Sequence, residues 1–197
     1  SRVMRMPFDG LSLMDYAINA TLSLQNIVLR NQDNAGLMVF SGQCETFLRA
    51  ERKFNQRQLL LDKLYNIRED QQEANYQALY ETIKMNIQGR SMLMLFTNFM
   101  SLNSLHRVLP VLKRINRSHL LTIIFFENPP LEAFIEKEPN NLLDMASNVL
   151  ASRLSNELTQ VVYELRNAGI QAIQTKPEDL TANAINKYLE LKSRGMI

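Results

Sequence analysis

The sequence predicts an α/β fold: a doubly wound, mostly parallel sheet covered by helices on both faces. Two runs of strand length, Met92–Phe96 and His119–Phe126, are apolar almost throughout, as in strands buried on both faces. Segments with helical spacing separate the runs of strand length, which favours parallel strands joined by right-handed crossovers. With 197 residues, the chain suits a single domain over 1–197 that buries roughly 70% of its unfolded surface.

The first expected element is a helix that follows the turn signal Asp9-Gly10. Ser12 and Asp15 have the spacing of a capping box, in which each residue hydrogen bonds to the backbone of the other. Apolar residues then recur with helical spacing up to Arg30. The helix is therefore expected to run from this capping box to Arg30.

A β-hairpin and two helices are expected next. The apolar run Gly36–Ser41, the turn Gly42-Gln43 and the weaker alternation of Cys44–Leu48 predict the hairpin. The two helices have their apolar faces between residues 60 and 67 and between residues 76 and 87. Gly89 is expected to cap the second of them.

The remaining elements alternate between strand and helix. The expected order is strand Met92–Phe96, helix Ser104–Asn116, strand His119–Phe126, polar loop Asn128–Asn140, helix Asn141–Asn167, strand Ile170–Ile173 and a last helix from Pro177 to Arg194. Pro110 lies inside the first of these helices. Because proline lacks a backbone N–H, it predicts either a late start or a kink in that helix.

The order of the elements places the first strand of the sheet outside this chain. The chain opens with a helix, whereas a doubly wound sheet has its first strand at the centre, so we expect that strand upstream of Ser1. A sheet without its central strand exposes unpaired backbone on both flanking strands. Either an upstream segment of a longer parent protein or another chain fills the position, which leaves strand exchange or a dimer open.

Composition argues against several classes of protein. The 22 Lys and Arg against 20 Asp and Glu give a net charge of +2, without the basic excess of a dedicated nucleic-acid binder. The single cysteine, Cys44, excludes an intrachain disulfide and a cysteine-based zinc site. No apolar run reaches the ~20 residues that span a bilayer. The first residues lack the apolar centre of a signal peptide.

Signatures of catalysis are scarce. The six glycines form no phosphate loop, dinucleotide fingerprint or nucleophile elbow. His106 is expected to be exposed on a helix, and His119 to be a hydrogen-bonded imidazole at the start of a buried strand. Cys44 is expected to be a small, half-buried hydrophobe. These residues give little support to hydrolase chemistry.

The strand Met92–Phe96 ends in Thr97-Asn98, at the edge where doubly wound sheets bind ligands. An Asp at such a strand end can hold a divalent cation, because hard cations prefer charged oxygen ligands. Asn98 has the same shape but no charge. This strand end therefore predicts either a metal or phosphate site, or only the outline of one.

Three segments, Arg2–Asn19, Ala35–Ser41 and Tyr188–Gly195, resemble the bacterial family called domain of unknown function 58, in particular its Bacteroidetes-type members. The resemblance spans essentially the whole chain. It implies a von Willebrand factor A-like domain, a doubly wound sheet with a metal-ion-dependent adhesion site at its top.

The metal site that the resemblance implies is degenerate in this sequence. Its usual ligands are an Asp-x-Ser-x-Ser loop, a Thr from a later loop and an Asp after the fourth strand. The first Asp would lie upstream, Ser1 matches the first Ser, and Val3 replaces the second. The later loop has Asn75 but no Thr, and Asn98 replaces the last Asp. We therefore expect no cofactor and no tight metal binding, with weak Mg²⁺ binding only if the upstream Asp is present.

The resemblance also implies a non-enzymatic protein-interaction module, an adaptor or co-chaperone to a MoxR-type AAA+ ATPase. Family members often carry transmembrane helices upstream, so the expected location is the cytoplasm, either free or as the cytoplasmic domain of a membrane-anchored parent. The expected partner-binding residues are Ser1, Arg2, Asp9, Ser41, Gly42, Gln43, Thr97 and Asn98. The alternative is a small-ligand-binding or hydrolytic enzyme that uses the same crevice, with Ser41, Thr97 and Asn98 as polar contacts.

Overall fold

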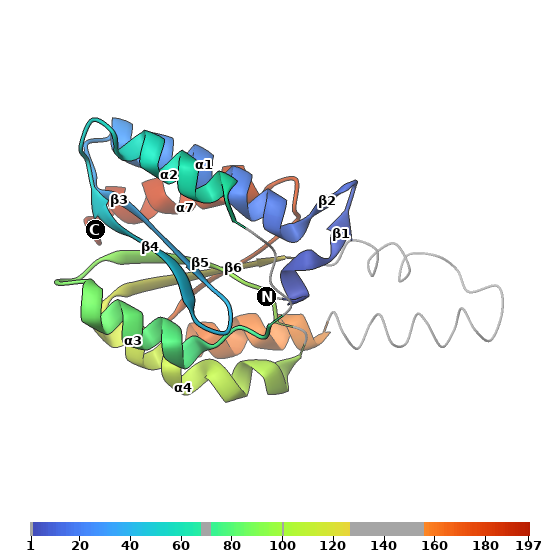
Figure 1. Ribbon diagram of the computed structural model, residues 1–197. Coiled ribbons are helices and arrows are strands. Elements are labelled where there is room, and N and C mark those ends of the chain that lie inside the picture. Colours follow the sequence, from blue (N-terminus) through green and yellow to red (C-terminus); the bar gives the residue numbers. More distant parts are fainter. Residues whose placement is uncertain (1, 68–71, 100, 127–155) are drawn as a thin grey trace.

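The computed structural model describes residues 2–67, 72–99, 101–126 and 156–197, and its longer strands lie between two layers of helices (Figure 1). One layer contains α1 (Leu13–Arg30), α2 (Gln56–Tyr65) and α7 (Leu180–Ser193). The other contains α3 (Tyr76–Asn86), α4 (Leu102–Ser118) and the helical residues 156–167. The predicted fold class is confirmed as a mixed α/β arrangement with a parallel sheet flanked by helices.

Three parallel strands form the larger sheet, in the order β5 (Met92–Phe96), β6 (Leu120–Phe126) and β7 (Gln171–Thr175). Ile123 in the middle of β6 lies opposite Leu95 on one side and Ala172 on the other. Every residue of β6 is buried, because the strand has a neighbour on each side and helices on both faces. The apolar runs of the sequence thus form the interior of this sheet.

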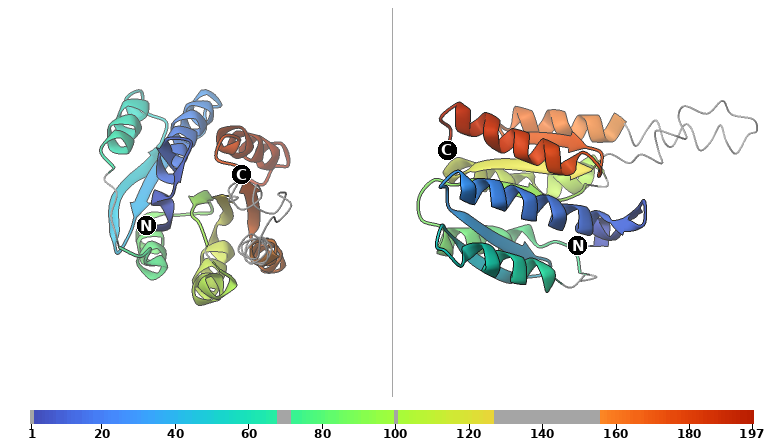
Figure 2. Two further views of the ribbon diagram at one scale, coloured as in Figure 1. Left: turned by 90° about the vertical axis from the view of Figure 1, so that its right-hand side faces the viewer. Right: turned by 90° about the horizontal axis from the view of Figure 1, so that it is seen from above.

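An antiparallel hairpin, β3 (Ala35–Phe40) and β4 (Cys44–Glu51), forms a separate sheet. Figure 2 shows the hairpin beside β5, in the same layer, when the strands are viewed end on. The strand layer therefore has a break between β3 and β5.

The N-terminal residues form a 3-10 helix, η1 (Arg2–Arg5), and a short hairpin, β1 (Pro7–Phe8) and β2 (Leu11–Ser12). The hairpin turns through Asp9 and Gly10, which have φ angles of 46° and 81°. α1 then begins with the predicted capping box: the hydroxyl of Ser12 accepts a hydrogen bond from the N–H of Asp15 (3.2 Å), and Oδ2 of Asp15 accepts one from the N–H of Ser12 (2.8 Å).

Two clusters of apolar side chains fill the spaces on either side of the strands. One cluster, toward α3 and α4, includes Leu105 and Phe125. The other, toward α1 and α7, includes Ala20, Ile124 and Phe126. Successive side chains of β6 thus enter opposite clusters, as the period of two in a strand requires. Each fully buried large side chain contributes about 1.5–3 kcal/mol of transfer free energy.

Several boundaries differ from the sequence predictions. α4 begins at Leu102, before the expected Ser104, and continues through Pro110 to Ser118, so the predicted late start is wrong. The expected loop 128–140 and most of the expected helix 141–167 lie outside the described residues. None of the described helices has the length and apolar character that crossing a membrane requires.

Candidate functional site

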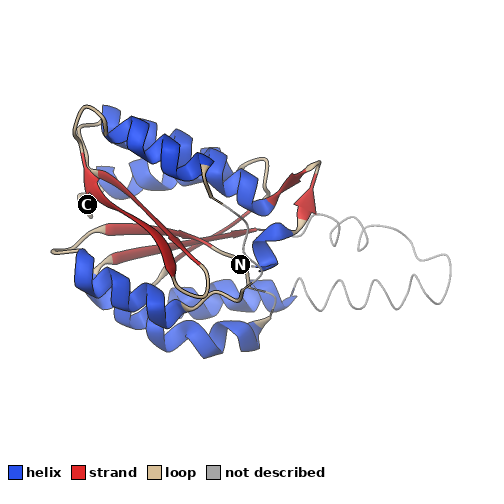
Figure 3. Cartoon of the chain, viewed as in Figure 1, coloured by secondary structure: helices blue, strands red, loops and turns tan. Residues whose placement is uncertain are grey.

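Most of the predicted site residues come together where the strands end. The turn Ser41–Gln43 follows β3, Asn75 precedes α3, and Thr97-Asn98 follows β5. We call this end of the molecule the carboxyl edge. Figure 3 shows that β1 and β2 also lie at this end.

Ser41 closes the turn between β3 and β4 through two hydrogen bonds. Its N–H donates to the carbonyl of Gln43 (2.9 Å), and its buried hydroxyl donates to Oε1 of Glu45. A Cβ on Gly42 would lie 1.8 Å from Oε1 of Gln72, so any larger residue there displaces that flexible side chain. The buried side chain of Ser41 therefore stabilises the turn, while Gln43 is exposed at its tip.

Asn75 connects this turn to the start of α3. Its N–H donates to the carbonyl of Ser41 (2.7 Å), and its side-chain Nδ2 donates to the carbonyl of Gly42 (3.1 Å). Its Oδ1 accepts a hydrogen bond from the N–H of Ala78 (3.1 Å), which makes Asn75 the N-cap of α3. The turn and the helix start therefore form one hydrogen-bonded unit.

Tyr76, the first residue of α3, joins this unit to the end of β5. Its hydroxyl lies 2.7 Å from Oγ1 of Thr97, and both side chains are buried. Burial raises the pKa of Tyr76 to about 12, while the hydrogen bond to Thr97 acts in the opposite direction. Oδ1 of Asn98 is buried and has no hydrogen-bond partner among the described residues. A donor that reached this oxygen would remove the cost of leaving it unpaired.

Four aromatic rings, which we call the aromatic chain, run from the hairpin to the parallel sheet. The ring centroids of Phe40 and Tyr76 are 5.6 Å apart, those of Tyr76 and Phe99 are 6.4 Å apart, and those of Phe99 and Phe125 are 6.3 Å apart. Such pairs contribute about 0.5–1.5 kcal/mol each beyond the area they bury. Side-chain packing thus links two sheets that share no backbone hydrogen bond among the described residues.

The raised pKa of Tyr76 predicts an alkaline limit to stability. Unfolded tyrosine ionises near pH 10, whereas folded Tyr76 stays protonated to about pH 12, so ionisation favours the unfolded chain as the pH rises between these values. The free energy of unfolding should fall by up to about 1.4 kcal/mol per pH unit in this range. In urea unfolding curves, the free energy of unfolding of Tyr76→Phe should no longer show this fall with pH. Tyr163→Phe, which replaces a residue that is 65% exposed, should still show it. Equal slopes for wild type and Tyr76→Phe would contradict the prediction.

The β1–β2 hairpin presents apolar side chains at the carboxyl edge. Met6, directly before β1, is 39% exposed, and Leu11 in β2 is 43% exposed. Asp9 at the tip of the hairpin is exposed as well. Met4 in η1 is buried and packs in the cluster toward α1. Met6 and Leu11 therefore supply exposed apolar surface at this edge.

The structure places the other predicted residues as follows. Ser1 lies outside the described residues, as do the side chains of Arg2 and Val3. In the described part of the chain, no three His, Cys, Asp or Glu side chains come together in a group that could hold a metal ion. The expectation that Asn75 and Asn98 are degenerate metal positions stays a prediction, because Ser1 and the side chain of Val3, which occupy the first ligand positions, lie outside the described residues.

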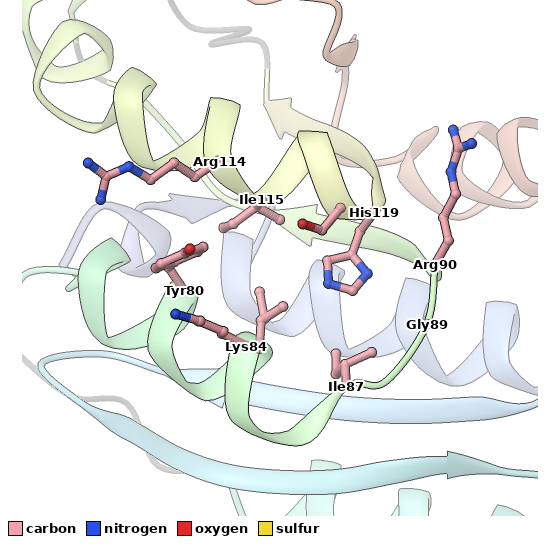
Figure 4. Close-up of a pocket in the computed structure, with 10 residues that line it drawn as sticks. Tyr80, Lys84, Ile87, Gly89, Arg90, Arg114, Ile115 and His119 are labelled. Carbon is pink, nitrogen blue, oxygen red and sulfur yellow. The ribbon is translucent and has the colours of Figure 1, made fainter.

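A second candidate lies at the opposite end of the parallel strands. It is a pocket of about 350 Å³ whose polar lining is Tyr80, Lys84, Arg90, Arg114, Ser118 and His119 (Figure 4). His119 is buried as predicted, but its Nδ1 has no hydrogen-bond partner among the described residues. Burial lowers the pKa of His119, which favours a neutral imidazole.

The charges around this pocket have a structural explanation. Figure 4 shows the side chains of Arg90 and Arg114 extending away from His119, toward opposite sides. Lys84 lies in the last turn of α3, and Arg117 in the last turn of α4. Cations in the last turn of a helix interact favourably with its unpaired carbonyl groups. These carbonyl groups give the helix end a partial negative charge, which disfavours binding of an anion there. The carboxyl edge is therefore the stronger candidate site.

Comparisons with known proteins provide no family for this chain. A scan against models of protein families and a search of curated proteins both found no match. The functional assignment therefore depends on the arrangement of the carboxyl edge.

Proposed function

We propose that this chain is a non-enzymatic protein-interaction module that binds its partner at the carboxyl edge. The observation that carries the proposal is a pair of exposed apolar side chains, Met6 directly before the β1–β2 hairpin and Leu11 within it. Exposed polar residues, Asp9 and Gln43, lie at the same edge. Protein interfaces commonly combine an apolar centre with a polar rim in this way.

The hairpin is held in place by contacts with α1. The carbonyl of Met6 accepts a hydrogen bond from the N–H of Leu13 (3.1 Å). The ring of Phe8 packs edge-on against that of Tyr16, with centroids 5.9 Å apart. A surface that is already ordered loses less conformational entropy when a partner binds, which favours affinity.

The partner we propose is a MoxR-type AAA+ ATPase, with this chain as a cytoplasmic adaptor or co-chaperone. The support is the resemblance of Arg2–Asn19, Ala35–Ser41 and Tyr188–Gly195 to domain of unknown function 58, whose members commonly accompany such ATPases. Within this proposal the fold is a single von Willebrand factor A-like domain, with Asn98 in a degenerate metal site. An antiparallel hairpin beside parallel strands is compatible with that fold.

The alternative of an enzyme or small-ligand binder has less support at this edge. The hydroxyl of Ser41 is engaged with Glu45, and that of Thr97 with Tyr76. Both side chains are buried. A polar contact with a substrate would have to break these hydrogen bonds, so we do not favour this alternative.

The double substitution Met6→Asp and Leu11→Asp tests the proposed binding face. A charged side chain cannot be buried in an apolar contact without a partner, so binding should weaken at least tenfold, or by about 1.4 kcal/mol. The measurement is isothermal titration calorimetry with the purified MoxR-type ATPase of the same organism.

The matched control is Leu61→Asp with Leu189→Asp. These leucines are 40% and 42% exposed on α2 and α7, so the control adds the same charge at similar exposure. It should leave affinity unchanged, and melting curves of both variants verify folding. Wild-type affinity in the Met6/Leu11 variant, or an equal loss in the control, would contradict the proposed face.

A further inference from the structure

The turn before α2 and one side of this helix carry large apolar side chains that face solvent. The ring of Phe54 is fully exposed, and Tyr65 at the end of α2 is 88% exposed. Leu61, one turn before Tyr65, is exposed as well. Single apolar side chains on a surface are common, whereas neighbouring ones indicate an interaction site. Leu61 and Tyr65 are such neighbours, because residues four positions apart lie side by side on a helix.

α2 has apolar residues on two of its sides. Leu60 and Leu64 are buried, and the helix contacts α1 and the β3–β4 hairpin. Arg57, Leu61 and Tyr65 recur at the same interval of four residues but are all exposed, so they lie along a second side of the helix. A surface helix usually has polar residues away from its buried side. Figure 2 shows α2 at the outer end of its helical layer, beside α1, where a partner can reach this second side.

The start of α2 is fixed to the β3–β4 hairpin by Gln56. The buried side chain of Gln56 donates hydrogen bonds from Nε2 to the carbonyl of Ala35 (2.7 Å) and to the carbonyl of Arg49 (2.9 Å). A surface that is held in this way loses less conformational entropy when it binds. We call the exposed side chains around this anchored start the α2 surface; they are Phe54, Arg57, Leu61 and Tyr65.

Basic side chains accompany the α2 surface. Residues 49–65 contain five basic and two acidic residues, a net charge of +3, whereas the whole chain has a net charge of only +2. Of the two acidic residues, Glu51 pairs with Lys53 (2.8 Å), and Asp62 accepts a hydrogen bond from Gln58 (2.8 Å). The positive charge of the chain is thus concentrated in this segment. Its five basic residues are all exposed: Arg49, Arg52, Lys53, Arg57 and Lys63.

The combination of charge and exposed rings distinguishes between possible occupants of the α2 surface. A second copy of the chain would bring positive charge against positive charge, which opposes association. A single-stranded nucleic acid would stack its bases on Phe54 and Tyr65, but Leu61 offers no ring for stacking. An anionic lipid surface matches the positive charge, and it takes up projecting rings and leucines without needing a preformed pocket. The observations therefore favour the lipid surface.

We propose that the α2 surface docks this protein on the surface of an anionic lipid membrane. Phe54, Leu61 and Tyr65 enter the boundary between headgroups and acyl chains, as the apolar side chains of interfacial helices do. Arg57 and the neighbouring basic residues keep their charged ends at the level of the lipid phosphates. This docking does not depend on the partner of the carboxyl edge, because Met6 and Leu11 belong to a different part of the surface.

The chain contains no tryptophan, so Phe54→Trp introduces a single fluorescent reporter at the α2 surface. With vesicles of phosphatidylcholine that contain about one-third phosphatidylserine, its emission should move to shorter wavelength and be quenched by brominated acyl chains. Vesicles of phosphatidylcholine alone should have little effect, because they lack the anionic charge. Salt at about 1 M, where the screening length is ~3 Å, should weaken the response. The control reporter is Tyr163→Trp, on the helical residues 156–167 of the other layer, and it should not respond.

The variant Phe54→Ala with Tyr65→Ala measures how much the two rings contribute. In sedimentation with the anionic vesicles, its partition coefficient should be roughly tenfold lower than that of the wild type, because apolar burial in the lipid is lost. The matched control is Met85→Ala with Tyr163→Ala, which also removes two exposed apolar side chains but from the other helical layer. This control should bind like the wild type, and melting curves of both variants verify folding.

Several results would overturn the proposal. One is an unchanged emission of the Phe54→Trp reporter with anionic vesicles, or an equal response of the Tyr163→Trp reporter. Another is equal binding to vesicles with and without phosphatidylserine. An emission shift that grows with protein concentration in the absence of vesicles would identify a second copy as the occupant. A response to a single-stranded oligonucleotide but not to vesicles would identify a nucleic-acid surface instead.

Discussion

Replacing Phe125 by alanine is expected to lower the free energy of unfolding by about 3–5 kcal/mol. Phe125 is completely buried in β6 and ends the aromatic chain next to Phe99. The substitution removes the ring and leaves a cavity that cannot close easily, because β6 is held by strands on both sides. Urea unfolding followed by circular dichroism measures the loss. In a chain of this size it corresponds to a fall in melting temperature on the order of 10 °C.

Phe54→Ala is the control for this prediction. It makes the same chemical change at a ring that is fully exposed, so the free energy of unfolding should change by no more than about 0.5 kcal/mol. A loss below about 1 kcal/mol for Phe125→Ala would show that the ring does not occupy the core position described for it.

Tyr76→Phe is expected to cost about 1–3 kcal/mol, because it leaves the buried hydroxyl of Thr97 without its partner. Thr97→Val should cost a similar amount, since it leaves the phenol of Tyr76 unpaired. The double variant removes both polar groups, so it should cost less than the sum of the single variants. Urea unfolding of the four proteins near pH 7 measures the coupling free energy.

Tyr80→Phe is the control for this cycle. Tyr80 lies on the same helix, and its hydroxyl has no hydrogen-bond partner in the described part of the chain. Its loss should change stability by no more than about 0.5 kcal/mol. Strictly additive costs for Tyr76→Phe and Thr97→Val would show that the two hydroxyl groups do not interact.

The elements that could be predicted are those whose signal is local in the sequence. The capping box of Ser12 and Asp15 joins residues three positions apart, and it was found from their spacing alone. β6 was recognised because a strand buried on both faces has an unbroken apolar run.

Other elements depend on tertiary contacts that the sequence does not display. β1 and β2 have two residues each, too few to show alternation. α4 continues through Pro110 because its apolar face, including Leu105 and Leu112, is buried against the sheet. That burial offsets the hydrogen bond that proline cannot donate.

The candidate site was predicted in position but not in its internal contacts. Ser41 and Thr97 were identified because strand ends in a parallel sheet meet at one edge. Asn75 was identified only through the resemblance, as a position in the loop that would supply a threonine ligand. Tyr76, however, was read as an ordinary apolar position on a helix face, and its bond to Thr97 joins residues 21 positions apart. Asn75 before a helical run is a typical N-cap, a signal that could have located the start of α3 and thus Tyr76. The exposure of Met6 and Leu11 depends on the whole fold and has no local signal.

The aromatic chain also determines how the protein can come apart. Strands of one sheet tend to unfold together because backbone hydrogen bonds join them. In the described residues, no such hydrogen bonds join the β3–β4 sheet to the sheet of β5, β6 and β7. The hairpin and α2 can therefore separate from β5, β6 and β7 without breaking the parallel ladders. Such partial openings require less free energy than global unfolding. The protein is thus expected to behave as two cooperative units. The ring contacts of Tyr76 with Phe40 and Phe99 contribute to the free energy that separates them, together with the hydrogen bonds of Asn75 to the hairpin turn and the contacts of α1 with β3 and α2.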